Sequence, residues 1–159
     1  MLISRNTMRA FGVALMALVL AACAGIPAIP GSPASAPFDQ LAYQNAANVK
    51  AQALALIDRA GEKYATRRAE AEALIAEIDR AYSYAQSRPN NQIATQAWEV
   101  IRNPQGGSVV AYVRTWQQRG SLPPAFRLEK RRQLAGHLDY VVCIEANKQT
   151  PTACGGPPG

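Results

Sequence analysis

The sequence of 159 residues contains only one histidine and three cysteines, and aromatic residues make up 7% of it. A single histidine, His137, offers no second imidazole for a metal site, and no Cys-x-x-Cys-His motif is present to attach haem. No serine stands in a nucleophile-elbow pattern, and no glycine-rich run opens a phosphate-binding loop. We therefore expect no cofactor, no metal site and no catalytic residue.

Long apolar runs are also scarce. The run from Ala10 to Leu20 has about 11 residues, well short of the roughly 20 that cross a bilayer as a helix. It follows a leader that carries Arg5 and Arg9 and no acid, which is the arrangement of an export signal peptide. No later stretch is long and apolar enough to span a membrane, so we expect the body of the protein to be water-soluble.

The apolar run ends in Leu20-Ala21-Ala22-Cys23, which resembles the lipobox of bacterial lipoproteins: an aliphatic residue, two small residues and a cysteine. The resemblance implies a diacylglyceryl thioether on Cys23, cleavage before that residue and usually a third acyl chain, such as palmitate, on the new amino terminus. Two or more chains hold a protein to a membrane for a long time, whereas one binds marginally. The alternative is an ordinary secretory signal with a chance cysteine.

The resemblance also bears on the destination of the protein. Residue 24 is Ala, and in bacterial lipoproteins an Asp at this position tends to retain the protein in the inner membrane. The resemblance therefore implies a place in the cell envelope, lipid-anchored on the outer membrane and facing the periplasm, if the host has an outer membrane. The globular part is similar, in general terms, to small proteobacterial lipoproteins with long alanine-rich helices. That similarity identifies no active residue.

Four prolines, at positions 27, 30, 33 and 37, mark residues 24–37 as a linker. Proline favours extended conformations, so at about 3.1 Å per residue the linker could hold a domain some 40 Å from the membrane. We divide the chain into a signal peptide at 1–22, the lipidated cysteine and linker at 23–37, a helical domain at 38–149 and a flexible tail at 150–159.

Small and apolar residues recur at steps of three and four between residues 39 and 87, which predicts one face of a helix. We predict one continuous helix of roughly 70 Å at 1.5 Å per residue. Gly61 costs about 1 kcal/mol in a helix interior, and the alternative is a bend or two separate helices there. The residues of this face are Ala53, Ile57, Ala60, Tyr64, Ala71, Leu74, Ile78, Ala81 and Ala85.

Three further helices are expected after the stop at Arg88-Pro89-Asn90-Asn91. Asn90 or Asn91 can cap the first, Ser108 can cap the second, which Gly120 closes, and Pro123-Pro124 begin the last. No stretch shows sustained strand alternation, so the predicted fold is all-α, a bundle with one long N-terminal helix. Such short helices cannot cover the long one, so it either projects or pairs with a second copy in a homo-oligomer.

Cys143 and Cys154 remain once Cys23 is assigned to lipid. An oxidising compartment favours a disulfide between them, which would hold the tail against the last helix. On the chain-entropy estimate, so small a loop stabilises by at most about 3 kcal/mol. Two free thiols, or a mixed disulfide with a partner, are the alternatives.

Positive charge gathers in the second half of the chain. Residues 88–159 hold nine basic and four acidic side chains, whereas residues 38–87 hold six and seven. A basic patch at an envelope membrane can meet anionic headgroups, lipopolysaccharide phosphates or peptidoglycan carboxylates; a solvated helix face is the alternative. Nucleic acid is excluded as a partner by the compartment. The candidate patch is Arg127, Lys130, Arg131 and Arg132.

The remaining chemistry-bearing residues have plain interpretations. Trp98 and Trp116 are expected in the core, with an aromatic ligand platform as the alternative, and His137 is expected to be structural or exposed. The acids Glu70, Glu72, Glu77 and Asp79 are expected to be solvated rather than a pair that hydrolyses glycan.

The predicted function is a non-catalytic, lipid-anchored envelope module that binds another protein or an anionic envelope polymer. A cell-wall enzyme and a prophage or immunity lipoprotein are the alternatives, and a deep pocket joining His137 to an acid would favour the enzyme.

Overall fold

The computed structural model describes residues 35–158. The signal segment, Cys23 and most of the linker lie outside the described residues. The described part is all-α, as predicted, and it contains no strand. Its elements, in chain order, are the α-helices α2 (Gln40–Arg59), α3 (Tyr64–Ser87), α4 (Gln92–Arg102), α5 (Val109–Arg119) and α6 (Pro124–Ala146), and the 3-10 helix η2 (Pro151–Cys154).

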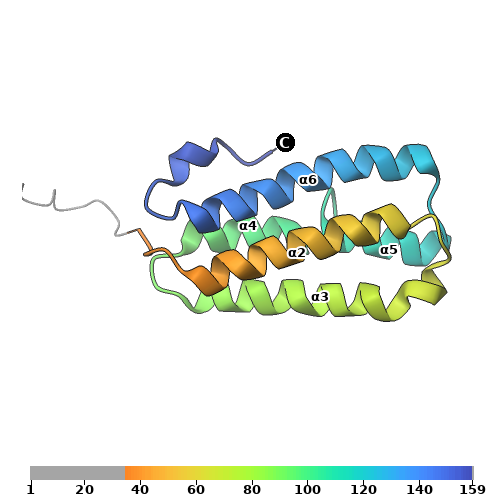
Figure 1. Ribbon diagram of the computed structural model, residues 1–159, viewed down its shortest axis with the longest axis horizontal. Coiled ribbons are helices and arrows are strands. Elements are labelled where there is room, and N and C mark those ends of the chain that lie inside the picture. The colour runs from red at the N-terminus through yellow and green to blue at the C-terminus, as the bar shows by residue number, and fades with distance from the viewer. Residues whose placement is uncertain (1–34, 159) are drawn as a thin grey trace, which may run out of the picture. The chain divides into compact units, whose positions relative to one another are not determined.

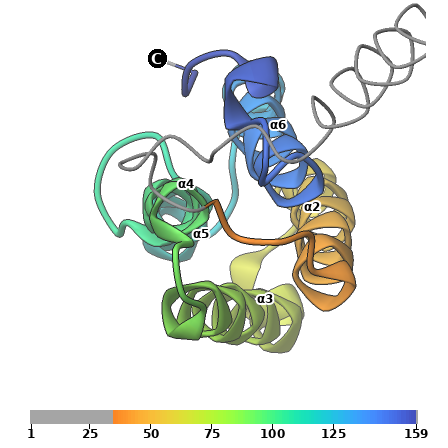
Figure 2. The ribbon, with the colours of Figure 1, turned by 90° about the vertical axis from the view of Figure 1, so that its left-hand side faces the viewer.

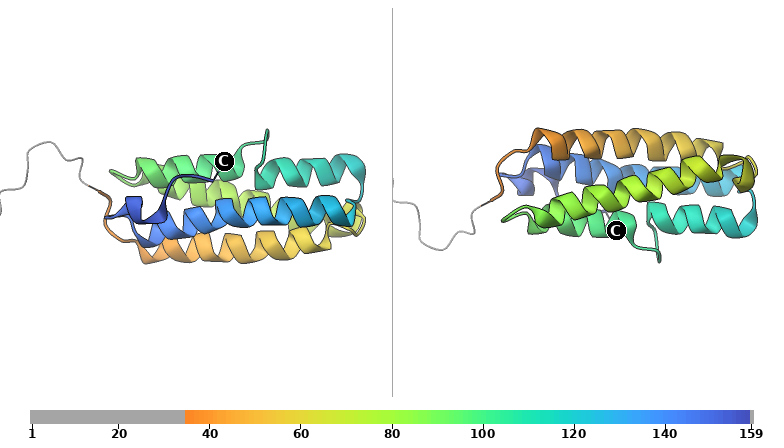
Figure 3. Two further views of the ribbon diagram at one scale, coloured as in Figure 1. Left: turned by 90° about the horizontal axis from the view of Figure 1, so that it is seen from above. Right: turned by 90° about the horizontal axis from the view of Figure 1, so that it is seen from below.

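The five helices form four rods that lie side by side along one axis, because α4 and α5 lie end to end and together make one rod (Figures 1 and 3). Viewed along the bundle, the rods stand at the corners of a square, in which α2 lies between α6 and α3 and the α4–α5 rod lies opposite it (Figure 2). Successive rods run in opposite directions. The described residues are therefore an up-down-up-down four-helix bundle whose third rod is broken.

The prediction of one continuous helix over residues 39–87 is wrong. α2 ends at Arg59, and the chain reverses before α3 begins at Tyr64. Two backbone hydrogen bonds fasten this turn to the loop between α5 and α6: Tyr64 donates to the oxygen of Gly120 at 2.6 Å, and Leu122 donates to the oxygen of Ala60 at 2.8 Å. Gly61 also allows a close neighbour, since a Cβ added there would lie 3.1 Å from the guanidinium carbon of Arg127.

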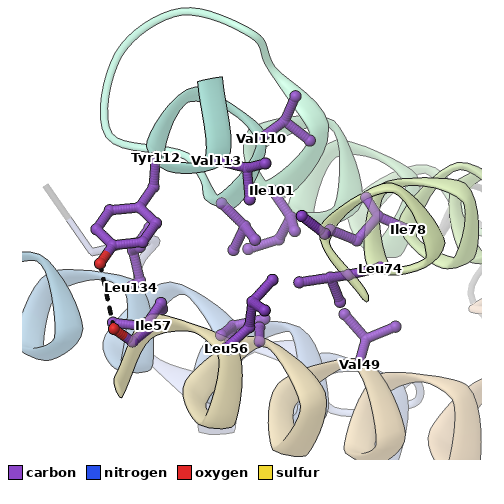
Figure 4. Close-up of a cluster of buried hydrophobic side chains, with 14 of the residues drawn as sticks. Val49, Leu56, Ile57, Leu74, Ile78, Ile101, Val110, Tyr112, Val113 and Leu134 are labelled. Atoms are coloured by element: carbon purple, nitrogen blue, oxygen red, sulfur yellow. Dashed lines mark hydrogen bonds between the residues drawn. The ribbon is translucent and has the colours of Figure 1, made fainter. Parts of the chain in front are cut away.

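The periodic positions were nevertheless predicted well, because every residue of the predicted face is buried. The pattern continues through the turn because α2 and α3 each bury one face in the same core. That core also receives side chains from α4, α5 and α6, as Figure 4 shows, and Tyr112 donates a hydrogen bond to the backbone oxygen of Ile57 at 3.3 Å. The apolar face that was expected to project or to need a second copy is thus covered within the chain.

Both tryptophans lie in the core, as predicted, with 1% of Trp98 and none of Trp116 exposed. Each indole N–H has a partner: Trp116 donates to the backbone oxygen of Glu62 at 3.0 Å, and Trp98 donates to Oε1 of Glu145 at 3.2 Å. The buried indole N–H groups are therefore satisfied, which buried polar groups require.

The predicted helix ends are largely confirmed. Ser108 caps α5 by accepting from the amide of Ala111 at 2.9 Å, Gly120 ends α5 with φ of +77°, and Pro124 is the first residue of α6. Asn91 stands at the cap position of α4, but its side chain makes no capping bond and donates to the backbone oxygen of Ala85 instead. Among the described residues, no helix has the length and apolar character to span a membrane.

Cys143 and Cys154 form the expected disulfide, with 2.03 Å between the sulfurs. The bond joins η2 to the last turn of α6 and returns the tail along α6 (Figure 3). Pro158 lies close to the middle of that helix, since its Cγ is 3.8 Å from the place of a Cβ on Gly136. Residues 150–158, expected as a flexible tail, thus contain a 3-10 helix and a covalent link.

Candidate functional site

The two ends of the bundle differ in chemistry, and we name them by what they contain. The tether end holds the start of α2, the end of α6 and residues 35–39, through which the linker joins the bundle. The distal end holds the α2–α3 turn and the α5–α6 loop (Figure 1). The 20 residues of α2 separate the two ends by about 30 Å.

The predicted basic patch lies at the distal end, in the first three turns of α6. Two of its members contact the end of α2. Arg127 donates from Nη1 to the backbone oxygen of Asp58 at 2.8 Å, and Arg131 donates from Nε to Oδ1 of the same residue at 2.8 Å. Positive groups at a helix C-terminus are favourable, since the helix dipole is negative there. Arg127 and Arg131 therefore link the start of α6 to the end of α2.

The other two members of the patch are less engaged. Lys130 donates to the neutral amide oxygen of Gln133 at 2.8 Å, and no carboxylate among residues 35–158 forms an ion pair with it. Arg132 pairs with Glu129 on its own helix, and its side chain is 72% exposed. An exposed pair of this kind contributes little and is easily exchanged for another partner. Lys130 and Arg132 are thus the members of the patch that can receive an anionic ligand.

Further cations stand at the distal end. Arg119 ends α5, and its guanidinium lies 5.5 Å from the ring centre of Phe126. Lys63 precedes α3. Within residues 35–158, neither Arg119 nor Lys63 forms an ion pair. Sequence reasoning did not single out these two residues, because they precede the basic run of α6 and join it only in the folded chain.

The acidic residues of α3 serve as ion-pair partners. Glu70 binds Arg67 at 2.7 Å and Arg59 at 3.3 Å, and Glu72 binds Arg68 at 2.6 Å. The hydrogen bond from Arg67 is the main cause of a lowered pKa at Glu70. Asp79 lies 3.2 Å from Arg102 on α4. Solvated ion pairs therefore account for three of the four acids that the sequence analysis singled out.

At the tether end, Asp39 fixes the entry of the chain. Its Oδ1 accepts from the amides of Leu41 and Ala42, and its Oδ2 accepts from the hydroxyl of Tyr84 at 2.8 Å. Arg88 lies 3.0 Å from the same oxygen. Burial acts to raise the pKa of Asp39, but these hydrogen bonds and the charge of Arg88 outweigh it, and the pKa lies below its usual value. One carboxylate thus caps α2 and joins it to the end of α3.

A buried ion pair adjoins this entry point. The side chains of Glu145 and Lys148 are 0% and 3% exposed, and Nζ of Lys148 lies 2.6 Å from Oε2 of Glu145. Lys148 also donates to Oδ1 of Asn91 at 3.0 Å, and Glu145 accepts from Trp98. The network connects the end of α6 to α4. It was not predicted from the sequence, although the i, i+3 spacing of Glu145 and Lys148 was a visible signal.

A cleft of about 350 Å³ opens beside this network and is lined by Ala36, Asn91, Lys148 and their neighbours. The charge of Lys148 is already matched by Glu145 and Asn91, so the cleft presents no uncompensated cation. We do not assign it a ligand.

His137 is buried in the middle of α6, with 6% of its surface exposed. The cleft that it lines contains no carboxylate from the part of the chain that the structure describes. The pocket joining His137 to an acid, which would favour a hydrolase, is not formed by these residues. No group of three or more possible metal ligands gathers within residues 35–158 either.

The fold and its two ends define a class of protein: a small four-helix bundle that its linker enters at one end and that carries basic side chains at the other, with one disulfide that fastens the C-terminal tail to α6. No family model matches the chain, and comparisons with curated proteins and with solved structures found no match.

Proposed function

We propose that the protein is a lipid-anchored module of the bacterial envelope, acylated on Cys23, whose bundle binds an anionic envelope polymer at its distal end without catalysing a reaction. One observation carries the proposal: the linker enters the bundle at the tether end, and the basic patch lies about 30 Å away at the opposite end. A linker that joins the bundle at one end and a binding surface at the other suit a module that reaches from a membrane toward a partner.

The cysteines support the anchored part of the proposal. The disulfide uses Cys143 and Cys154, which leaves Cys23, in the lipobox, as the third cysteine of the chain. Disulfides persist in oxidising compartments such as the periplasm. The pairing therefore agrees with the export that the signal segment predicts. The outer membrane, rather than the inner, is proposed because residue 24 is Ala and not Asp.

Electrostatics supports the anionic partner. Arg132 is exposed and pairs only with the exposed Glu129, the half-buried Lys130 pairs with no carboxylate of residues 35–158, and Arg119 and Lys63 add two cations at the same end. Such a surface attracts phosphates and carboxylates, and the attraction weakens as salt screens it. A second copy of the chain is not proposed as partner, because the bundle covers the face that suggested one.

Labelling with a radioactive fatty acid tests the anchor. We expect the label to enter the wild-type protein and to be absent from Cys23→Ser, which should also fail to partition with membranes. Equal labelling of both proteins would refute acylation on Cys23. Cys143→Ser is the control, because it removes a thiol that lies outside the lipobox.

Sedimentation with lipopolysaccharide vesicles and with peptidoglycan sacculi tests the distal end. We expect Lys130→Gln with Arg132→Gln to weaken binding at least threefold. Lys50→Gln with Arg80→Gln removes the same charge from the middle of the bundle and should weaken binding less than twofold. If both pairs of substitutions had equal effects, binding would follow net charge alone and the distal end would not be the site.

A further inference from the structure

The exposed apolar side chains of the bundle are concentrated at the tether end. Within residues 35–158, the exposed large apolar or aromatic side chains are Phe38, Leu41, Tyr43, Ile93, Val100 and Leu128. Phe38 precedes the cap of α2, and Leu41 and Tyr43 lie in the first turn of that helix. Ile93 is the second residue of α4 and lines a cleft together with Ser35, so it lies at the same end. Four of these six side chains therefore stand at the end where the linker joins the bundle, which faces the viewer in Figure 2.

We call Phe38, Leu41, Tyr43 and Ile93 the apolar tip. Phe38 and Leu41 are 55% and 51% exposed, and the ring centres of Phe38 and Tyr43 lie 6.2 Å apart. Transfer of apolar side chains out of water is favourable. Tyrosine is in addition enriched at membrane–water interfaces, because its ring is apolar and its hydroxyl is polar. The apolar tip therefore has the chemistry of a surface that contacts lipid.

No exposed, unpaired carboxylate accompanies the apolar tip. Among residues 35–43, 86–94 and 143–158, which form this end, the acidic residues are Asp39 and Glu145. Their side chains are 10% and 0% exposed, and each pairs with a cation, Arg88 and Lys148 respectively. Charged groups are costly to bring into lipid, and free carboxylates are repelled by anionic headgroups. The tether end can approach a bilayer without either cost, whereas the distal end presents charged side chains.

The linker keeps this end close to the membrane. Residues 23–34 span at most about 40 Å even when fully extended. If acyl chains on Cys23 hold the protein to a bilayer, the apolar tip stays within that distance of the lipid surface. A short tether of this kind gives an effective concentration in the millimolar range. A contact too weak to bind a free protein is then populated.

We propose that the apolar tip docks on the lipid surface in which Cys23 is anchored, with Phe38 and Leu41 between the lipid headgroups. The docked bundle stands with its long axis away from the bilayer, so the distal end is presented about 30 Å farther out. This inference rests on the acylation of Cys23 in the proposed function and adds the orientation of the anchored bundle. The occupant of the tip is the bilayer, not a second copy of the chain or a soluble protein.

Tryptophan fluorescence can report the contact, because Trp98 and Trp116 are buried in the core. Brominated acyl chains, in vesicles of phosphatidylethanolamine and phosphatidylglycerol, quench a tryptophan only at close range. The acylated full chain carries either Phe38→Trp or, as the matched control, Leu128→Trp at an exposed residue of the distal end. We expect bromination to lower the added fluorescence of Phe38→Trp at least twofold and that of Leu128→Trp by less than about a fifth. Quenching at position 38 that is no stronger than at position 128 would overturn the proposal.

A second substitution tests whether apolar side chains make the contact. In the Phe38→Trp background, Leu41→Ser should reduce the quenching at least twofold. Val100→Ser, a matched change at an exposed residue farther along α4, should leave it unchanged. About 0.5 M sodium chloride should also leave it unchanged, because salt screens charges and not apolar contacts. Equal effects of the two serine substitutions, or loss of quenching in salt, would refute docking through the apolar tip.

The intact mass of the purified wild-type chain separates this inference from the proposal on which it rests. An unmodified amino terminus would refute the acylation of Cys23 and the docking with it. An acylated chain without selective quenching at position 38 would refute the docking alone.

Discussion

Arg127 donates a hydrogen bond from Nη1 to the backbone oxygen of Asp58 at 2.8 Å and lies directly over Gly61. One arginine of α6 thereby closes the C-terminal end of α2 and covers the turn to α3. The contact favours a glycine at position 61, because the Cβ of a larger residue would lie 3.1 Å from the guanidinium carbon. It also means that a side chain counted in a binding patch has a structural task.

A double-mutant cycle tests the contact between Gly61 and Arg127. Gly61→Ala alone should lower the free energy of unfolding by about 0.5–1 kcal/mol, since the new Cβ displaces Arg127. In an Arg127→Ala background the same change should raise it by about 0.5 kcal/mol, because alanine restricts the unfolded chain. Urea unfolding measures both values. Identical effects in the two backgrounds would show that Arg127 does not restrict position 61.

The buried pair of Glu145 and Lys148 predicts that removing the cation alone costs more unfolding free energy than changing both partners. Lys148→Met should destabilise by about 3–5 kcal/mol, because it leaves a buried carboxylate without its cation. Glu145→Gln combined with Lys148→Met should cost less than Lys148→Met alone, since the amide removes the stranded charge and can still accept from Trp98. Chemical unfolding monitored by tryptophan fluorescence measures the difference. Additive losses would contradict the coupling.

The lowered pKa of Asp39 predicts how stability depends on pH. A carboxyl group whose pKa is lower in the folded state stabilises fully above its unfolded value, about 3.9, and loses that contribution as the pH falls through the folded value. Asp39→Asn should therefore flatten the fall in unfolding free energy below about pH 4. Asp139→Asn, at an exposed carboxylate that pairs with Lys50, is the control. Parallel profiles for wild type and Asp39→Asn would refute the linkage.

The disulfide predicts a local rather than a global effect of reduction. Dithiothreitol should raise amide hydrogen exchange in residues 150–158 while exchange in α3 stays within about twofold, because the main contacts of η2 and its covalent link are to α6. The loss in unfolding free energy should not exceed about 3 kcal/mol. Cys143→Ser with Cys154→Ser should behave like the reduced protein. Unfolding of the whole bundle on reduction would show that the tail has a larger role.

Local signals in the sequence determined much of this protein. The spacing of Ala53, Ile57, Leu74 and Ile78 identified buried positions, because a helix repeats every 3.6 residues wherever it packs. Ser108, Gly120 and Pro124 marked helix ends, because each acts on backbone groups a few residues away. Cys143 and Cys154 were paired correctly because only two cysteines remained. Cys23 and its lipobox were read from the same kind of local motif, and they remain predictions.

The tertiary structure alone decided what depends on residues far apart in the chain. Periodicity is the same for one long helix and for two that bury their faces in a common core, so only the bonds from the turn to Gly120 and Leu122 distinguish them. Charge counts named Arg127 and Arg131 but could not show that Asp58, some seventy residues earlier, binds both. The buried partners of Glu145 and the burial of His137 are likewise consequences of packing, because burial is a property of the folded chain and not of any short segment.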